Sequence, residues 1–198
     1  MQHLTTNQIY EHLFAVIKSQ NFLQKKGLGN EVPFFICPFG AAQQVEMDRI
    51  RKQLVSNLRN NGVVVLDIDL YDLAIDILKG RGLWERITTT ESSLEKSDLK
   101  DLLRNVLDPE KHLVPKIAER MAQKSHHVMF LSGVGETYPY IRSHTILNNL
   151  QSTAKNQPTV LFFPGTYAHS AETGASLDLF DRLRDDKYYR AFNILEYI

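Results

Sequence analysis

The sequence predicts an α/β protein with a mostly parallel sheet and helices on both faces, and two observations support this. Apolar runs at 33–40, 63–69, 128–135 and 159–165 each end in glycine, proline or acidic residues, as strands buried on both faces do. Helical patterns fill the chain between them, and this alternation is typical of parallel sheets. Because ligands bind beyond the carboxyl ends of such strands, the residues that follow each run are candidate site residues.

Composition narrows the class of protein. The chain has 198 residues, which favours one α/β domain over 1–198. Its 23 Lys and Arg balance its 23 Asp and Glu, so it lacks the basic excess of unaided nucleic-acid binders, and no direct sequence-specific DNA contact is expected. The single Cys37 excludes an internal disulfide and is expected to be a buried thiol. Neither a signal-peptide pattern nor a membrane-length apolar run is present, which predicts a cytoplasmic protein.

The first two helices are predicted from their ends and their apolar spacing. Thr5 and Gln8 have the spacing of a capping box, and the helix that they begin is expected to end near Gly27. A second helix follows the first strand and is closed by Asn61 and Gly62. Its buried side is predicted to comprise Met47, Ile50, Leu54, Val55 and Leu58.

The chain between the second and third strands is predicted to be helical throughout. Asp69 would begin one helix, Ser92 and Glu95 have capping-box spacing before another, and Asp108 followed by Pro109 would begin a third. About 55 residues exceed a simple crossover. We therefore expect a helical insertion at about 70–124, packed on the same core.

The remaining elements are predicted more coarsely. A helix is expected at about 143–152, and a loop rich in Ala, Gly, Ser and Thr at 168–176. The last ten residues fit either a strand or a helix.

The turn after the first strand lacks the residues that grip phosphate. A P-loop there would need GxxxxGK[ST], whereas the chain has CPFGAAQQVEMDR. The fold is therefore expected to resemble a P-loop NTPase core of the AAA type that lacks the P-loop. Asp67 and Asp69 end the second strand on one face and could orient magnesium in a nucleotide hydrolase. Without the lysine, an N-cap at Asp69 with Asp72 in the first turn is favoured.

The densest polar segment is SGVGETYPYIRSH at 132–144. Gly133 and Gly135 could form an anion-binding turn addressed by Arg142 and His144. The structural alternative is a turn fixed by Pro139 and a helix capped by Ser143. Neither a GxSxG nucleophile motif nor a spaced set of metal ligands is present, so no catalytic residue, metal or cofactor is assigned.

Aromatic and cationic residues suggest a contact surface. The loops after the third and fourth strands should bring Tyr138, Arg142, His144 and Tyr167 together, and such residues dominate protein interfaces. Tyr188, Tyr189 and Arg190 add to this set near the C-terminus. Tyrosine and arginine also suit stacking on single-stranded bases, but four acidic residues in the same stretch weigh against nucleic acid. These are Asp178, Asp181, Asp185 and Asp186.

Five segments taken in order resemble the BrxB family of bacteriophage-exclusion (BREX) defence systems. They are PFFICPFG, VVVLDIDLYDL, FLSGVGETYPYIRSHTILNNLQ, PTVLFFPGTY and RLRDDKYYRAFNI. The most specific parts are GVGETYPYIRSH and PGTY followed by YYRAF. The resemblance implies a small core subunit without an established catalytic motif. It also implies larger neighbours, namely an alkaline-phosphatase-like protein of the PglZ type, a large ATPase of the BrxC type and an adenine methyltransferase.

Three functions follow in order of preference. The first is a non-catalytic adaptor of a phage-defence complex, which leaves self-association open. The second is a nucleotide-binding or hydrolysing protein that uses Asp67, Asp69 and Arg142 without a P-loop. The third is a nucleic-acid-binding module that uses residues of the C-terminal region. Those residues are Arg182, Arg184, Tyr188, Tyr189 and Arg190.

Overall fold

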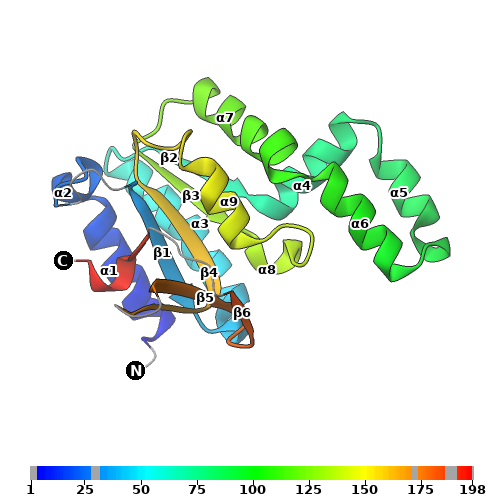
Figure 1. Ribbon diagram of the computed structural model, residues 1–198. Coiled ribbons are helices and arrows are strands. Elements are labelled where there is room, and N and C mark those ends of the chain that lie inside the picture. The colour runs from blue at the N-terminus through cyan, green and yellow to red at the C-terminus, as the bar shows by residue number, and fades with distance from the viewer. Residues whose placement is uncertain (1–3, 28–31, 171–173, 186–190, 198) are drawn as a thin grey trace.

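A parallel sheet forms the centre of the computed structural model, which describes residues 4–27, 32–170, 174–185 and 191–197 (Figure 1). Its strands lie in the order β2-β3-β4-β1-β7. All four neighbouring pairs are parallel, so the predicted α/β class with a mostly parallel sheet is confirmed. The strands are β1 (Phe34–Phe39), β2 (Val65–Asp69), β3 (Val128–Ser132), β4 (Thr159–Ser170) and β7 (Phe192–Asn193).

Helices cover both faces of the sheet, as predicted, and each face has its own apolar core. Successive residues of a strand point to opposite faces. Phe35 and Phe130 therefore pack on the side of α1 and α3, whereas Ile36 and Met129 pack on the side of α4, α7 and α9. These helices are α1 (Thr6–Ile17), α3 (Gln44–Asn60), α4 (Leu70–Gly80), α7 (Val114–Gln123) and α9 (Ser143–Leu150).

The fourth strand is longer than predicted. β4 runs on to Ser170 and turns back through β5 (Gly174–Leu179) and β6 (Leu183–Asp185) as an antiparallel extension. The predicted loop at 168–176 is therefore wrong for 168–170 and 174–176, which pair with each other as strands, while 171–173 lie outside the described residues. Gly165 permits the change of partner, since its φ is +153° and a Cβ there would lie 2.1 Å from the carbonyl oxygen of Asp178.

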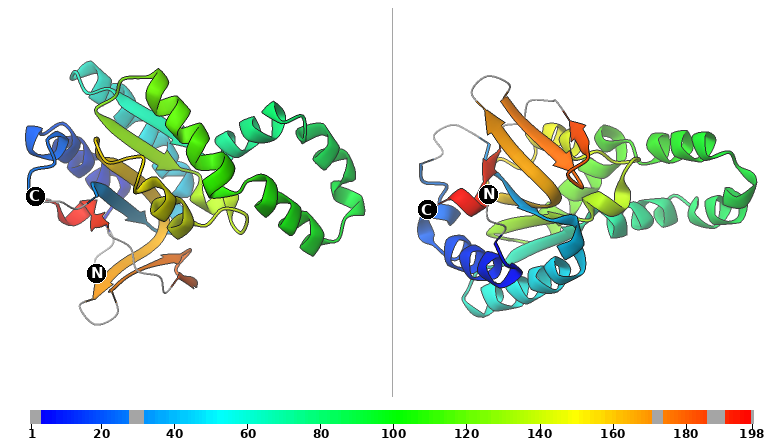
Figure 2. Two further views of the ribbon diagram at one scale, coloured as in Figure 1. Left: turned by 45° about the horizontal axis from the view of Figure 1, so that its top comes forward. Right: turned by 90° about the horizontal axis from the view of Figure 1, so that it is seen from below.

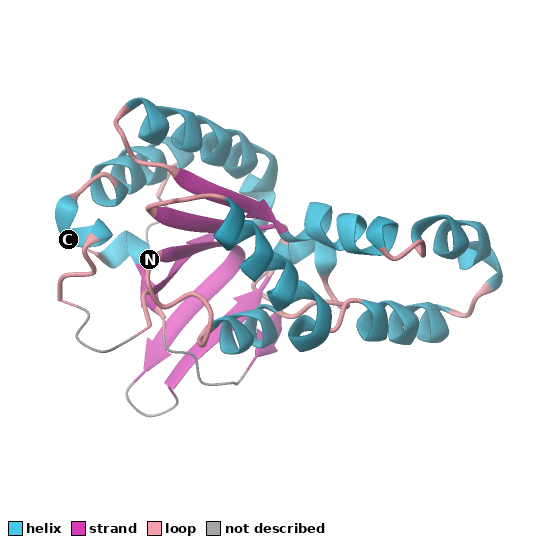
Figure 3. Cartoon of the chain, turned by 90° about the horizontal axis from the view of Figure 1, so that it is seen from above, coloured by secondary structure: helices cyan, strands magenta, loops and turns pink. Residues whose placement is uncertain are grey.

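The chain between β2 and β3 is helical, as predicted. After α4 come α5 (Trp84–Thr90), a 3₁₀ turn η2 (Glu91–Ser93), α6 (Lys96–Val106), a π-helical turn η3 (Pro109–Leu113) and α7. Figures 1 and 2 show that α5 and α6 project away from the sheet, and Figure 3 shows the same from above. We call residues 84–106 the helical arm.

Most predicted helix starts are confirmed by their caps. Thr5 forms a capping box with Gln8, and the side chains of Asp69 and Asp108 accept hydrogen bonds from the first turns of the next helices. Two cap predictions, Ser92 for α6 and Ser143 for α9, are wrong. The N-cap of α6 is Glu95 and that of α9 is Arg142, and neither makes a side-chain cap bond.

The two ends of the chain differ from their predictions in detail. The first helix ends at Ile17, well before Gly27, because Ser19 caps a separate short helix α2 (Gln20–Leu23). The C-terminal residues form both candidate elements, first β7 and then a 3₁₀ turn η4 (Ile194–Glu196). Among the described residues, no helix is long and apolar enough to cross a membrane.

Candidate functional site

An arginine lies between the two carboxylates at the carboxyl end of β2. Arg51 reaches them from α3, with its Nη1 donating to Asp67 Oδ1 and its Nη2 3.8 Å from Asp69 Oδ2. The Arg51 side chain is only 6% exposed, and its carboxylate partners retain about a quarter of their exposure. We call Arg51, Asp67, Asp69 and Ser132 the arginine centre.

Asp69 is fully engaged within this centre. Its Oδ1 accepts hydrogen bonds from the backbone amides of Tyr71 (2.9 Å) and Asp72 (3.3 Å), and its Oδ2 accepts one from the Ser132 hydroxyl (2.9 Å). The prediction that Asp69 caps α4 is confirmed. Gly133, with a φ of +80°, fits tightly beside it, because a Cβ there would lie 2.6 Å from Asp69 Oδ1.

Burial shapes the electrostatics around the arginine centre. It raises the pKa of Asp67, while the Arg51 guanidinium acts in the opposite direction. Glu136, which follows β3, is an exposed residue, but partial burial of its carboxyl raises its pKa, and the nearby charges of Asp48 and Asp69 raise it further. Negative charge therefore gathers just outside the arginine centre. Among the described residues, no group of three or more His, Cys, Asp or Glu side chains could hold a metal ion.

The turn that follows β1 is closed on itself. Gln43 Oε1 accepts a hydrogen bond of 3.0 Å from the backbone amide of Gly40. This bond spans the 3₁₀ turn η1 (Ala41–Gln43), which precedes α3. Beside it is a hollow of about 450 Å³ at the carboxyl end of β1 and at residues 165–167 of β4, just after the parallel part of β4 ends. Phe39, Thr166 and Glu196 are among its lining residues. This is where ligands of parallel sheets bind.

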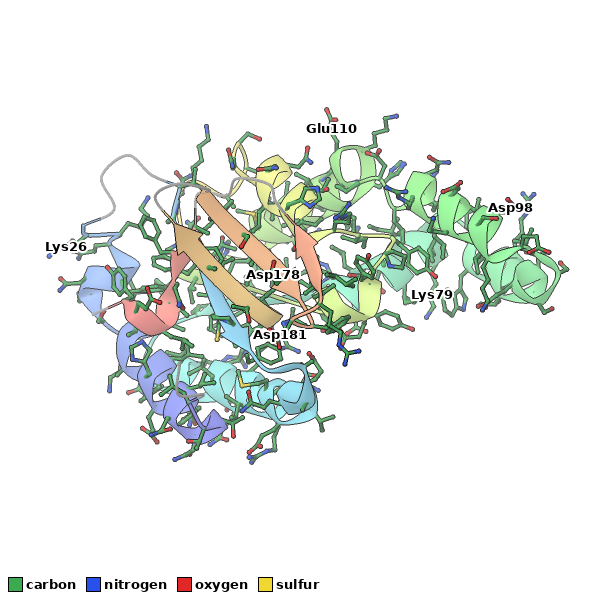
Figure 4. The ribbon with its side chains drawn as sticks, turned by 60° about the horizontal axis from the view of Figure 1, so that its bottom comes forward. Lys26, Lys79, Asp98, Glu110, Asp178 and Asp181 are labelled. Atoms are coloured by element: carbon green, nitrogen blue, oxygen red, sulfur yellow. The ribbon has the colours of Figure 1, made fainter. Side chains whose placement is uncertain are left out.

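A second hollow, of about 210 Å³, contains two of the predicted contact residues. Tyr138 and Arg142 line it from the loop after α8 (Val134–Thr137), and Arg182 and Leu183 line it from the hairpin of β5 and β6. Its floor is apolar, with Leu177 and Leu179 among its residues. Asp178 and Asp181 mark this hairpin in Figure 4. We call this site the two-arginine hollow. It presents cationic side chains around an apolar floor.

Of the other predicted contact residues, His144 and Tyr167 do not line the two-arginine hollow. His144 is buried, and Tyr167 is buried with its hydroxyl donating to the carbonyl oxygen of Ala191 at 2.6 Å. Tyr167 also lines the 450 Å³ hollow, not the two-arginine hollow. Tyr188, Tyr189 and Arg190 lie outside the described residues. Partner binding by these residues stays a prediction, and burial argues for a structural role of His144 and Tyr167.

Arg51 is the residue that the sequence prediction missed. Its signal was present, because an arginine stands directly beside the apolar stripe of α3 formed by Met47, Ile50 and Leu54. A cation on a buried helix face requires a carboxylate opposite it. The two aspartates of β2 were the available partners.

The fold and these sites define an α/β protein with a parallel sheet. The arginine centre lies at the carboxyl end of β2, and an open hollow lies at the carboxyl end of β1. A family model described as "BREX protein BrxB" matches residues 66–194. This chain belongs to the BrxB family, and the predicted resemblance is confirmed.

Two relatives carry the same description. The BREX protein BrxB of Bacillus cereus (strain H3081.97) is 31% identical over 194 residues, which cover 96% of this chain and 97% of that protein. The BREX protein BrxB of Escherichia coli O9:H4 (strain HS) is 28% identical over 179 residues, which cover 90% of this chain and 86% of the relative. No solved structure matches the chain significantly.

Proposed function

We propose that this protein is a non-catalytic adaptor subunit of a BREX phage-defence complex in the cytoplasm. Membership of the BrxB family supports the role in phage defence. The adaptor would hold together larger components, of which the alkaline-phosphatase-like protein of the PglZ type and the large ATPase of the BrxC type are the proposed partners.

The arginine centre is the observation that carries the non-catalytic part of the proposal. The carboxylates that could have oriented magnesium instead bind Arg51, a helix terminus and Ser132. The turn after β1 has no phosphate-gripping lysine. The proposed scaffold is a P-loop NTPase core of the AAA type with 70–124 as its helical insertion, and the parallel strand order 7-1-4-3-2 supports this part of the proposal.

The two-arginine hollow supports the adaptor part of the proposal. Arg142 and Arg182 are both exposed, and they come from segments about 40 residues apart in the chain. Arginine and tyrosine around an apolar floor are the composition of interface anchors. A partner would insert an apolar side chain between the arginines and pair an acidic group with them.

Co-purification with the two larger BREX proteins tests this proposal. Arg142→Ala and Arg182→Ala should each weaken the complex about thirtyfold, equivalent to about 2 kcal/mol, the size of an interface anchor. Arg59→Ala is the matched control, since Arg59 is exposed near the end of α3 and lines neither hollow. Circular dichroism melts should place all three variants near the parent.

Two results would contradict the proposal. The first is an unchanged complex and full defence with both arginine variants. The second is a large fall in melting temperature for Arg142→Ala, because the arginine would then hold its own loop together.

A nucleotide-binding function is the second candidate, and the 450 Å³ hollow at the carboxyl end of β1, beside residues 165–167 of β4, favours it. A thermal-shift titration with ATP and magnesium discriminates the two functions. The adaptor function predicts no shift. A saturable shift would support nucleotide binding instead.

A further inference from the structure

A third hollow lies between the helical arm and the body of the protein. It measures about 210 Å³, and its walls come from α4, α5, α6 and the segment around α8. Most of its lining side chains are apolar. Six of them are Ile75, Leu78, Trp84, Ile87, Leu99 and Leu103. We call this site the arm hollow.

The arm leaves much of this apolar surface in contact with water. Ile87 is the only buried residue of α5, and Val106 is the only one of α6. Trp84, Leu99 and Leu103 are only half-buried, and Leu102 is 38% exposed. Helices of seven and eleven residues are marginal by themselves and depend on packing. A partner that covers the arm hollow would supply the missing packing.

The charged side chains that line the arm hollow are negative, and one cation lies beside its wall, because Lys79 Nζ is 5.7 Å from the ring centroid of Trp84. The hollow's only charged lining residues are Glu91 and Glu136, and both are exposed carboxylates. Asp48 and Asp69 add negative charge near Glu136, and the Arg51 guanidinium acts on it in the opposite direction. Tyr71 is 47% exposed and lines the hollow, and its backbone amide donates a hydrogen bond to Asp69 Oδ1.

The walls also determine which backbone can bind there. Helices α4, α5 and α6 line most of the hollow, and the backbone groups of helices pair within each helix. An extended peptide would therefore find no strand edge to extend. A helix satisfies its own backbone and needs only side-chain contacts, which this hollow provides.

We propose that the arm hollow binds a basic amphipathic helix of a partner protein, with apolar side chains inserted between α4 and the arm and lysine or arginine on Glu91 and Glu136. This inference rests on the proposed adaptor function and names the chemistry of one partner. It adds a second contact surface to the two-arginine hollow, with the opposite charge preference. One subunit could then hold an acidic segment and a basic segment at separate sites.

The test uses a defined probe and the full chain. The probe is a synthetic fluorescein-labelled peptide with leucine at i, i+3, i+4 and i+7 and lysine at the remaining exposed positions. Fluorescence anisotropy should show saturable binding by the parent. The same peptide with glutamate in place of lysine should not bind, because the rim of the hollow is acidic.

Variants locate the binding. Glu91→Lys and Glu136→Lys should each weaken the lysine peptide about tenfold, equivalent to about 1.4 kcal/mol. Tyr71→Ser should weaken it by removing an apolar wall. Asp101→Lys is the matched control, since Asp101 is exposed on α6 but lines a different hollow, and its affinity should equal that of the parent. Figure 4 labels Asp98, which belongs to the same helix, on the projecting arm.

Equal losses of peptide affinity in Glu136→Lys and Asp101→Lys would overturn the inference, because the affinity would then depend on the net charge of the protein alone. Co-purification separates this inference from the proposed function. If the parent retains its BREX partners and the three hollow variants retain them equally, the arm hollow is not a docking site and the adaptor function stands. If the parent retains no partner, the adaptor function fails, and peptide binding still decides the chemistry of the hollow.

Discussion

Strand β3 and helix α6 both contain apolar residues, yet they bury them to very different extents. All five residues of β3 are buried, whereas one of the eleven residues of α6 is. β3 lies inside the sheet between β2 and β4, with helices on both faces. Helix α6 belongs to the projecting arm and packs toward α4 and α5 on one side.

This difference separates stability from binding. Buried apolar area is the main favourable term in folding, so the sheet and its covering helices should supply most of the free energy of unfolding. Regions with few buried contacts open at lower free energy and are often the regions that bind. Leucines on the arm are therefore available to a partner because the fold does not bury them.

A pair of leucine substitutions tests the comparison directly. Leu54→Ala on α3 removes a fully buried side chain and should lower the free energy of unfolding by about 2 to 5 kcal/mol. Leu102→Ala on α6 should change it by less than about 0.5 kcal/mol, because this side chain is already partly in water. Urea unfolding followed by circular dichroism measures both. Comparable losses would show that the arm belongs to the core.

Arg51→Met tests whether the arginine centre contributes to the free energy of unfolding, as the apolar core does. The substitution leaves Asp67 and Asp69 without their cation and should lower the free energy of unfolding by about 2 to 3 kcal/mol, below the range for fully buried pairs because both carboxylates keep some exposure. The measurement is again urea unfolding.

The control for this substitution removes the charges as well. Arg51→Met combined with Asp67→Asn and Asp69→Asn should recover much of the loss, since no unpaired charge remains and asparagine still caps α4. If Arg51→Met alone has the same free energy of unfolding as the parent, the ion pairs of Arg51 do not stabilise the fold.

Glu136→Gln tests the boundary between the sheet end and the arm, and its effect should be smaller than that of Arg51→Met. Burial and the charges of Asp48 and Asp69 raise the pKa of Glu136 above its ordinary 4.5, so the folded state binds this proton more tightly than the unfolded state. Ionisation therefore opposes folding. The parent should lose this stability as pH rises from about 4.5 through the raised pKa.

The variant should accordingly be more stable than the parent at pH 7, by less than about 1 kcal/mol because water screens an exposed group. The difference should vanish below about pH 4.5. Repeating the pair in an Asp48→Asn background should reduce the difference, since one source of repulsion is gone. If the stability difference between Glu136→Gln and the parent does not change with pH, ionisation of Glu136 is not its cause.

The sequence predicted the strands well because their apolar runs are long and bounded by turn residues. Phe35, Met129 and Leu161 are buried in central strands as their patterns indicate, although Val64 precedes β2 and is only half-buried. Cys37 is buried as predicted, and burial raises the pKa of its thiol to about 12. The hairpin of β4 and β5 was missed because its small polar residues have the composition of a loop.

The site was less predictable than the fold. Local spacing placed Asp69 correctly as a cap, because a cap involves residues only two or three positions apart. Arg51 meets Asp67 across 16 residues, and Arg182 meets the Arg142 loop across about 40. Contacts of that range depend on how helices pack on the sheet, and no local pattern encodes them.

By itself, the sequence determined the parallel α/β class, most strands and helix caps, the absence of a P-loop lysine and the BrxB family. Each of these follows from the spacing of nearby residues or from the identity of single residues. The tertiary structure alone decided that the strand-end aspartates neutralise an internal arginine and that the arm remains partly uncovered. It also decided that Tyr138 and Arg142 share a hollow while Tyr167 is buried. Burial and charge pairing are properties of three-dimensional neighbours, and these neighbours exist only once the helices have docked on the sheet.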